Sequence, residues 1–508
     1  MFRKDNMLPV IYYVKPGDSL YSIAIKFNIT PSGVRDYNKL KSNTIYAGQK
    51  IYIPATFYVV QPKNSLYDIA KTLNTTVESI NKLNGLKSTN LYIGQSLKIP
   101  FYSEVVAKVD NISVRSGPDY SYRELQKMAI NSKMQMVGSR DGWYKVKLYN
   151  DEFGWIPKAQ ANFNVYWVEK PISTILGYYT REEGPALPSS YQSFVDNKNS
   201  IPELGLFLFR IDPKDATNIE KFGDFTDEYV KNIVLIGHRS NVKVLATVHN
   251  LLYRDGGTTL AKELVSTMVS TPETRGAFIN NILLLLRKYN FDGVNMDIED
   301  VYLKDSDKLS LFYEELSRKL KVEGYYVSAA LPARVSDEPF NPFSDPFNYG
   351  RIGNALDEAV IMLYNEHGWP GSGPGPVVSI GWMERVIGYT ITKMPRENVV
   401  AAVSVFGFDF NLTTGRNTYV TYDMAVNLAK KYNREIIFDE KTQTPTFAYT
   451  DEKGENHEVW FEDTRSIKAK IDKAYQMGIK GIALWRLGME DQGIWDMLKN
   501  QVVVAFGK

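Results

Sequence analysis

Cysteine is absent from the chain, which excludes disulfide bonds, thiolate nucleophiles and metal sites with cysteine ligands. Histidine is scarce, and none of the four residues, His238, His249, His367 and His457, belongs to an HExxH motif. We therefore expect no dedicated metal site. Long apolar runs are also missing, because runs such as residues 282–286 are far shorter than a membrane-spanning helix.

No charge of one sign dominates the chain. Its 60 Lys and Arg residues nearly balance 58 Asp and Glu residues, so the composition indicates neither nucleic acid nor anionic lipid as a partner. The first 100 residues are nevertheless basic, with 13 Lys and Arg against 5 Asp and Glu. The N-terminus, which begins with residues 1–6, lacks the apolar run of about 7–15 residues found in secretory signals, so we expect no conventional export signal.

At 508 residues the chain is long enough for several domains, and a repeat with a period of 46 residues occupies the first of them. In each copy the pattern predicts a short strand, a helix capped by Ser19 or Ser65, a second short helix and a closing strand. We therefore predict two βααβ modules, at residues 10–55 and 56–101. The matching pairs include Pro16 and Pro62, Asn38 and Asn84, Tyr46 and Tyr92, and Gly48 and Gly94.

The repeated order Tyr-x-Val, Gly-Asp-Ser-Leu, Ile-Ala, Asn, Gly-Gln, Ile-Pro resembles the LysM module. Members of that family bind glycans that contain N-acetylglucosamine, such as peptidoglycan and chitin, and the basic character of this region favours a polymer bearing carboxylates. The second copy departs from the first in having Lys63-Asn64 in place of Gly17-Asp18. The polar candidates for glycan contact are Asn28, Asn38, Asn74 and Asn84.

Residues 103–163 change character to short alternating strands separated by Gly, Asp and Asn turns, which predicts a small β-barrel. The segments 112–118 and 154–156 resemble the bacterial SH3-like domain. A structural spacer and a ligand-binding domain are both consistent with this pattern.

From residue 170 onward, apolar strand-like runs alternate with helical stretches, which is typical of parallel strands with helical crossovers. We predict a (β/α)8 barrel over residues 170–505, with a small α+β insertion at about 410–463. An open doubly wound sheet is the alternative, although no Gly-rich phosphate loop follows the first run. The eight runs are 175–179, 205–209, 242–248, 293–299, 326–331, 358–364, 399–405 and 481–485.

The fourth run carries polar residues at its carboxyl end, where the active sites of such barrels lie. Its period of two places Asn295, Asp297 and Glu299 on one face. Two carboxylates in an apolar run are costly unless they have a function. We infer that they line the mouth of the barrel.

This run, residues 292–299, resembles the Asp-Gly-x-Asp-x-Asp-x-Glu signature of glycoside hydrolase family 18, with Asn295 at one acidic position. Further strand-end matches are residues 328–332, 362–365 and Trp485. A barrel of this kind behind two LysM modules is similar to the spore cortex-lytic N-acetylglucosaminidases of endospore-forming bacteria.

The resemblance implies a retaining reaction in which the 2-acetamido group of the sugar attacks its own anomeric carbon. Glu299 would be the general acid, Asp297 would hold the acetamido N–H, and Asn295 would hydrogen-bond Asp297. Tyr364 would bind the acetamido oxygen with help from Asn365, and Trp485 would form the floor under the sugar. No cofactor is required. Further candidates for the groove are Tyr178, Met362, Glu366, Trp369, Trp460 and Glu462.

These expectations combine into a cell-wall hydrolase that cleaves peptidoglycan after N-acetylglucosamine and is located in the spore cortex or coat region or in the cell wall. A chitinase is one alternative. The other is a non-catalytic glycan-binding or coat-structural protein. Exo or endo action, dependence on muramic lactam and the oligomeric state stay open.

Overall fold

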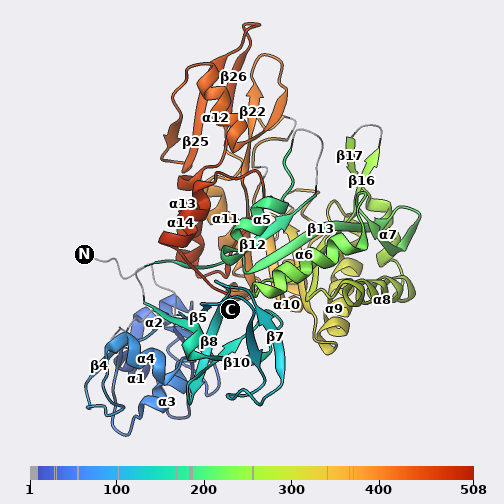
Figure 1. The fold of residues 1–508 in the computed structure, drawn as a ribbon. Coiled ribbons are helices and arrows are strands. Elements are labelled where there is room, and N and C mark those ends of the chain that lie inside the picture. Colours follow the sequence, from blue (N-terminus) through green and yellow to red (C-terminus); the bar gives the residue numbers. More distant parts are fainter. Residues whose placement is uncertain are drawn as a thin grey trace. The chain divides into compact units, whose positions relative to one another are not determined.

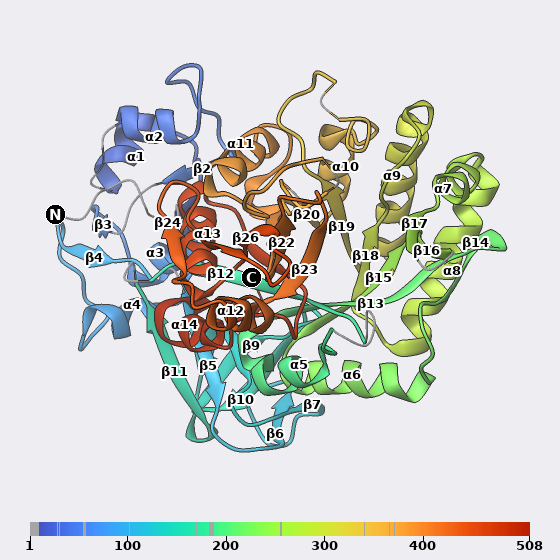
Figure 2. The same ribbon diagram turned by 90° about the horizontal axis from the view of Figure 1, so that it is seen from above.

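The computed structural model describes residues 10–27, 29, 31–53, 57–100, 102–167, 170–181, 187–254, 257–339, 341–364, 366–369 and 371–507 (Figures 1 and 2). The chain divides into two compact units. The first comprises residues 1–172 with the short segments 239–241 and 505–508, and the second comprises residues 173–238 and 242–504. Within the described ranges, no helix combines the length and the apolarity needed to cross a membrane.

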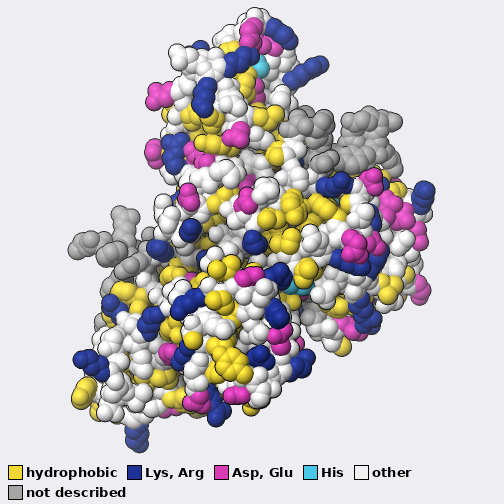
Figure 3. All heavy atoms as spheres, in the orientation of Figure 1, with side chains coloured by type: hydrophobic (Ala, Val, Ile, Leu, Met, Phe, Trp, Pro, Cys, Tyr) yellow, Lys and Arg dark blue, Asp and Glu magenta, His cyan; other side chains and the backbone are white. Residues whose placement is uncertain are grey.

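The first unit begins with two βααβ modules, which confirms the predicted repeat. In each module the two strands pair antiparallel and Ser19 or Ser65 caps the first helix by accepting a backbone N–H. Lys and Arg side chains are spread over this part of the surface in Figure 3. The elements are β1 (Val10–Tyr13), α1 (Leu20–Lys26), α2 (Pro31–Tyr37) and β2 (Lys50–Ile53), then β3 (Phe57–Val59), α3 (Leu66–Thr72), α4 (Val77–Asn84) and β4 (Ser96–Lys98).

The departure of the second copy from the first preserves a contact. In the first copy the hydroxyl of Tyr12 donates to Asp18 over 2.6 Å, and in the second the hydroxyl of Tyr58 donates to Asn64 over 2.7 Å. Asn64 can replace Asp18 because an amide oxygen accepts the same hydrogen bond. Lys63 has a positive φ of 66°, and its counterpart Gly17 has a φ of 87°. This left-handed region is strained for a residue with a side chain.

A seven-stranded antiparallel sheet follows, in the order β11-β5-β8-β9-β10-β6-β7, and it has its own apolar core around Val105, Val114 and Val146. This arrangement confirms the predicted small β domain. The strands are β5 (Tyr102–Ala107), β6 (Ile112–Arg115), β7 (Glu124–Met128), β8 (Lys133–Arg140), β9 (Trp143–Lys147), β10 (Phe153–Pro157) and β11 (Ala161–Tyr166).

The second unit contains a closed barrel of eight parallel strands, one for each predicted run. The barrel closes because β12 pairs with both β13 and β27. An open doubly wound sheet is thereby ruled out. In order around the barrel, the strands are β12 (Ile172–Tyr179), β13 (Glu203–Asp212), β15 (Lys243–His249), β18 (Gly293–Asp297), β19 (Tyr326–Pro332), β20 (Glu358–Met362), β21 (Val399–Ser404) and β27 (Gly481–Trp485).

Helices cover the outside of the barrel (Figure 2). The longest, α8, begins at a capping box made by Thr271 and Thr274 and ends at Asn290 in the left-handed conformation. Leu176, Val360, Val400 and Ala483 are fully buried in an apolar cluster of the barrel strands. The main helices are α6 (Asp227–Arg239), α8 (Pro272–Tyr289), α9 (Ser306–Val322), α10 (Tyr349–Ala355), α11 (Ile380–Thr390), α13 (Thr464–Met477) and α14 (Gly493–Gln501).

An additional antiparallel sheet, in the order β23-β22-β26-β25-β24, lies between the seventh and eighth barrel strands in the sequence. Helix α12 packs on it through Ala425 and Ala429, which join Phe447, Val459 and Phe461 in a separate core. The elements of this insert are β22 (Phe406–Asn411), β23 (Asn417–Thr421), α12 (Tyr422–Lys431), β24 (Ile437–Asp439), β25 (Thr444–Thr450) and β26 (Asn456–Trp460).

Candidate active site

Strand β18 and the residues after it supply the acidic side chains of the site. Asn295 and Asp297 are buried on the strand, 0% and 5% exposed. Glu299 is half-buried and lies in the connection after the strand. The expected strand extends to Glu299, whereas the observed strand ends two residues earlier, at Asp297.

The side chain of Asn250 explains why the strand ends there. Its Oδ1 accepts the backbone N–H of Glu299 over 3.0 Å, and its Nδ2 donates to the Glu299 carbonyl over 2.8 Å. These two bonds take the place of a neighbouring strand. Asn250 directly follows β15 and is 1% exposed, so it fixes the backbone that carries the Glu299 carboxyl group.

Burial controls the protonation of both acids. It raises the pKa of Asp297 to about 7. Burial, followed by the negative charges of Asp297 and Asp300, raises the pKa of Glu299 well above its usual range. Asp297 Oδ1 is buried and has no hydrogen-bond partner among the described residues. The site therefore offers a Glu299 carboxyl group that holds its proton to higher pH than a free glutamic acid, beside an oxygen of Asp297 that can still accept a hydrogen bond.

Asn295 begins a chain of hydrogen bonds that runs inside the barrel. The hydroxyl of Tyr178 donates to Asn295 Oδ1 over 3.1 Å, and Asn295 Nδ2 donates to Ser328 Oγ over 2.8 Å. Ser328 Oγ in turn donates to Glu358 Oε1 over 3.0 Å, and Glu358 is ion-paired with Lys480. Among the bonds found in the described part of the chain, none joins Asn295 to Asp297, so the expected bond between them is not formed.

Aromatic rings surround Trp485 at the end of β27. The ring of Tyr178 lies edge-on at 5.2 Å between centroids, that of Phe207 edge-on at 5.0 Å, and that of Tyr364 stacked at 6.2 Å. The ring of His249 stacks on the ring of Phe207, with 4.0 Å between the two centroids. Half-buried Trp485 thus belongs to a wall of rings, a surface that suits the apolar face of a pyranose.

Tyr364 is part of the same wall of rings and also lies within the electrostatic influence of Asp297. Burial, followed by the charge of Asp297, raises the pKa of its hydroxyl well above the usual range. The hydroxyl therefore stays protonated and can donate a hydrogen bond. Asn365, the neighbouring candidate, lies outside the described residues.

Three of the other candidate residues have partners away from the acidic pair. Met362 is the buried last residue of β20. Both oxygens of Glu366 accept hydrogen bonds from Ser379, the cap of α11, so the observed contacts of Glu366 serve that helix. Glu462 is fully buried in an ion pair with Lys470 at 2.7 Å. Trp460 donates to Glu458, whereas Trp369 is 53% exposed.

In the repeated modules, Asn38 and Asn84 are engaged internally. Asn38 Nδ2 donates to the carbonyls of Val34 and Tyr52, and Asn38 Oδ1 accepts the N–H of Tyr52. Asn84 makes the equivalent three bonds in the second copy. These amides hold each second helix to its closing strand. Asn28 lies outside the described residues.

Exposed tyrosines are a surface feature of both copies that the sequence analysis did not select. Tyr21 and Tyr67 occupy equivalent positions, as do Tyr46 and Tyr92. Each is at least 66% exposed. Their recurrence at the repeat period is the signal that could have identified them as glycan-stacking candidates.

Comparison with protein families identifies the family to which this site belongs. Residues 214–490 match the model of glycosyl hydrolases family 18, and this range includes Asn295, Asp297, Glu299, Tyr364 and Trp485. The chain belongs to family 18. Residues 12–54 and 58–100 match the LysM domain, and residues 110–160 match the bacterial SH3 domain.

Several proteins resemble this family 18 chain over long stretches. The cortical fragment-lytic enzyme of Bacillus anthracis is 29% identical over 280 residues, 54% of this chain and 63% of that protein. An uncharacterized glycosylase of Bacillus subtilis, YvbX, is 25% identical over 337 residues, 66% of this chain and 97% of that protein. The crystal structure of the spore cortex-lytic enzyme SleL of Bacillus cereus is 25% identical with a TM-score of 0.60, covering 99% of this chain and 100% of that one.

Four residues of the family 18 barrel were not predicted from the sequence: Asn250, Ser328 as a partner of Asn295, and the aromatic pair Phe207 and His249. His249 and Asn250 directly follow the third apolar run, residues 242–248. Polar residues at the carboxyl end of a barrel strand indicate function. The same rule that selected Glu299 would have found them. Phe207 lies within an apolar run and carries no such signal.

Proposed function

We propose that this family 18 hydrolase cleaves peptidoglycan after N-acetylglucosamine, with retention of configuration, and acts on spore cortex or its fragments. The observation that carries the proposal is the pair of a buried Asp297 and a half-buried Glu299, two residues apart and both with raised pKa values. The names of the similar Bacillus proteins support the cortex as the substrate. The LysM modules would hold the enzyme on the insoluble glycan.

In the first step the acetamido oxygen of the bound sugar attacks its anomeric carbon. The glycosidic bond breaks, its electron pair goes to the leaving oxygen, and Glu299 gives that oxygen its proton. Asp297 Oδ1 accepts a hydrogen bond from the acetamido N–H and stabilises the positive oxazolinium ring. Tyr364 donates to the acetamido oxygen and positions it for the attack.

In the second step the ionised Glu299 removes a proton from water, and the oxygen of that water attacks the anomeric carbon. The bond between this carbon and the acetamido oxygen breaks, which regenerates the acetamido group. Both attacks invert the carbon, so the overall configuration is retained. Trp485 and the rings around it would pack against the sugar during both steps.

Product analysis tests this proposal. Purified spore cortex fragments and chitin oligosaccharides are incubated separately with the full chain, and the products are identified by mass spectrometry, with the anomer followed by NMR. We expect cortex products ending in reducing N-acetylglucosamine, released first as the β-anomer. Faster cleavage of chitin would favour the chitinase alternative, and release of the α-anomer first would contradict the mechanism.

Asn295→Asp is expected to move the pH optimum upward by about one unit without abolishing activity. An ionised carboxylate at this buried position repels the charges of Asp297 and Glu299 and raises both pKa values. Asp297 then ionises at a higher pH and Glu299 keeps its proton to a higher pH, so both limbs of the rate profile move in the same direction. The pH dependence of kcat/KM for the two proteins measures this shift, and an unmoved profile would contradict it.

A further inference from the structure

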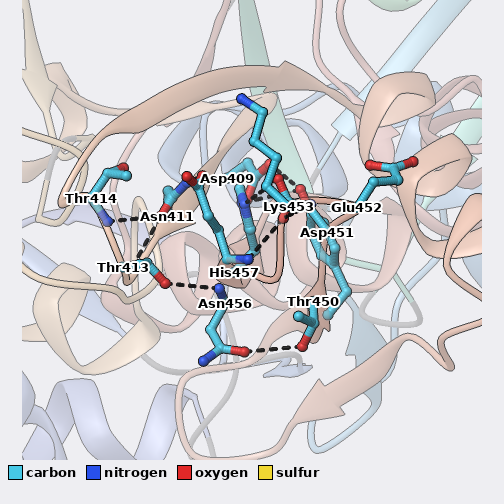
Figure 4. Close-up of polar contacts among 12 residues, drawn as sticks. Asp409, Asn411, Thr413, Thr414, Thr450, Asp451, Glu452, Lys453, Asn456 and His457 are labelled. Carbon is cyan, nitrogen blue, oxygen red and sulfur yellow. Dashed lines mark hydrogen bonds and ion pairs between the residues drawn. The ribbon is translucent and has the colours of Figure 1, made fainter.

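Side chains of types that can ligate a metal ion meet at one end of the insert, outside the proposed catalytic residues. Asp451 and Glu455 lie in the turn between β25 and β26, and His457 is on β26. Figure 4 shows Asp451 and His457 close together. One potential ligand atom from each residue lies within 4.8 Å of the others. We propose that these three residues bind a divalent transition-metal ion, with Zn²⁺ as the best fit to their donor atoms.

His457 is held in one orientation by two neighbouring side chains. Its Nδ1 lies 2.8 Å from Asp409 Oδ1, and its ring stacks on Tyr449 at 4.5 Å. Tyr449 also donates to the second oxygen of Asp409 over 2.6 Å. A histidine that donates its Nδ1–H to a carboxylate has the lone pair on Nε2, which is the usual arrangement of a metal-binding histidine. Asp409 thus selects the tautomer that can coordinate.

The second ring nitrogen of His457 faces Asp451. His457 Nε2 is buried and has no hydrogen-bond partner within the described part of the chain. It lies 3.8 Å from Asp451 Oδ2, which is too long for a hydrogen bond. Two ligands held tetrahedrally at about 2.0–2.2 Å from one zinc ion lie about 3.3–3.6 Å apart. The observed separation is only slightly longer, so a small movement of either side chain would bring both atoms to one ion.

The two carboxylates are also oriented by neighbours. Asp451 Oδ1 accepts the backbone N–H groups of Lys453 and Glu455 over 2.9 and 2.8 Å, and its Oδ2 is the oxygen near His457. Glu455 Oε2 accepts from Asn411 Nδ2 over 2.6 Å. Each ligand thus has one atom fixed by a partner, as found around established metal sites.

The cluster contains more negative than positive charge. Asp409, Asp451 and Glu455 bring three carboxylates around one imidazole, and a divalent cation would balance them. A protonated His457 paired with Asp409 and Asp451 is the competing explanation. It does not account for Glu455, whose carboxylate belongs to the same cluster.

The donor set also selects the ion. An imidazole nitrogen favours zinc and its neighbours over Mg²⁺ and Ca²⁺, which prefer oxygen ligands only. Three protein ligands leave a fourth position for water. Because Asp409 and Asn411 belong to β22, a bound ion would tie the β25–β26 turn to the neighbouring strand and stabilise the insert.

The test uses the untagged full chain, freed of metal with EDTA and dialysed. Isothermal titration with ZnCl₂ is expected to show one saturable site, and the melting temperature is expected to rise until that site is filled. MgCl₂ at the same concentrations should give neither effect. Glu455→Gln keeps the size of the side chain and should remove the saturable binding, as should His457→Asn. Asp409→Asn should weaken binding at least about tenfold.

Glu452→Gln is the matched control, because Glu452 lies in the same turn but pairs with Lys431 instead of the cluster. It should bind Zn²⁺ like the wild type. The proposal is overturned if the wild type has no saturable site, if Mg²⁺ binds as tightly as Zn²⁺, or if Glu455→Gln and His457→Asn leave the affinity unchanged. Circular dichroism of each variant verifies that the fold is intact.

Discussion

Glu299→Gln is expected to slow the cleavage of cortex glycan by about 10²–10⁴-fold, the usual contribution of a general acid. The amide has nearly the shape of the acid but carries no proton that it can give to the leaving oxygen. The raised pKa of Glu299 extends the pH range over which the wild-type acid carries its proton, so the loss extends over that range as well. The measurement is kcat/KM for defined cortex fragments at constant pH.

A change of leaving group separates the acid role from a general disturbance of the site. A nitrophenyl glycoside departs without a proton, so Glu299→Gln should slow its release less than it slows cleavage of the natural bond. Asp297→Asn should slow both substrates, because it weakens stabilisation of the oxazolinium ring in each case. Glu228→Gln, at an 83% exposed side chain on α6, is the control and should leave both rates unchanged. Natural-substrate rates within twofold of the wild type for Glu299→Gln would contradict the proposed acid.

The barrel was predictable because continuous apolar runs are typical of parallel strands that are buried on both faces. All eight runs became barrel strands, and the motif 292–299 placed the acids at the correct end of the fourth. The end of β18 was not predictable. The bonds that stop the strand come from the side chain of Asn250, 49 positions away from Glu299, and periodicity within one segment contains no information about them.

Contacts between strands explain the other omissions. Asp409 and His457 come together because β22 and β26 pair antiparallel, with Asn411 opposite His457. The spacing of histidines along the chain therefore predicts no metal site, although a group of suitable ligands exists. In the same way, Glu203, Glu358 and Lys480 each lie at or just before the start of a strand, where a charged residue usually faces solvent. Only closure of the barrel brings them together.

Lys480→Met is expected to destabilise the barrel by about 3–5 kcal/mol, the usual cost of removing one partner from a buried ion pair. Lys480 Nζ is ion-paired with Glu358, lies 2.7 Å from Glu203 Oε1, and donates to the hydroxyl of Tyr326 over 3.0 Å. The side chains of all three charged residues are no more than 7% exposed. Methionine fills the space but leaves both carboxylates buried without their ion pair to Lys480.

The pH dependence of this loss identifies its cause. Burial, then the charge of Glu203, raises the pKa of Glu358 to about 7, whereas attraction to Lys480 and Lys243 outweighs burial and lowers the pKa of Glu203. Because folded Glu358 holds its proton more tightly than the unfolded residue, its contribution to stability is present below about pH 4.5 and is lost as the pH rises towards 7. Without Lys480 both glutamates favour the protonated form. The difference between Lys480→Met and the wild type should therefore be largest at alkaline pH and shrink on acidification.

Differential scanning calorimetry measures this effect as a fall of roughly 5–10 °C in the melting temperature of the second unit at pH 7.5. The triple variant Lys480→Met, Glu203→Gln, Glu358→Gln is the matched control. It removes the two buried charges along with their cation, so most of the lost stability should return. If Lys480→Met melts within 1–2 °C of the wild type, the shift expected from a change of about 1 kcal/mol or less, the cluster does not hold the barrel together. If the triple variant is as unstable as the single one, loss of packing rather than uncompensated charge is the cause.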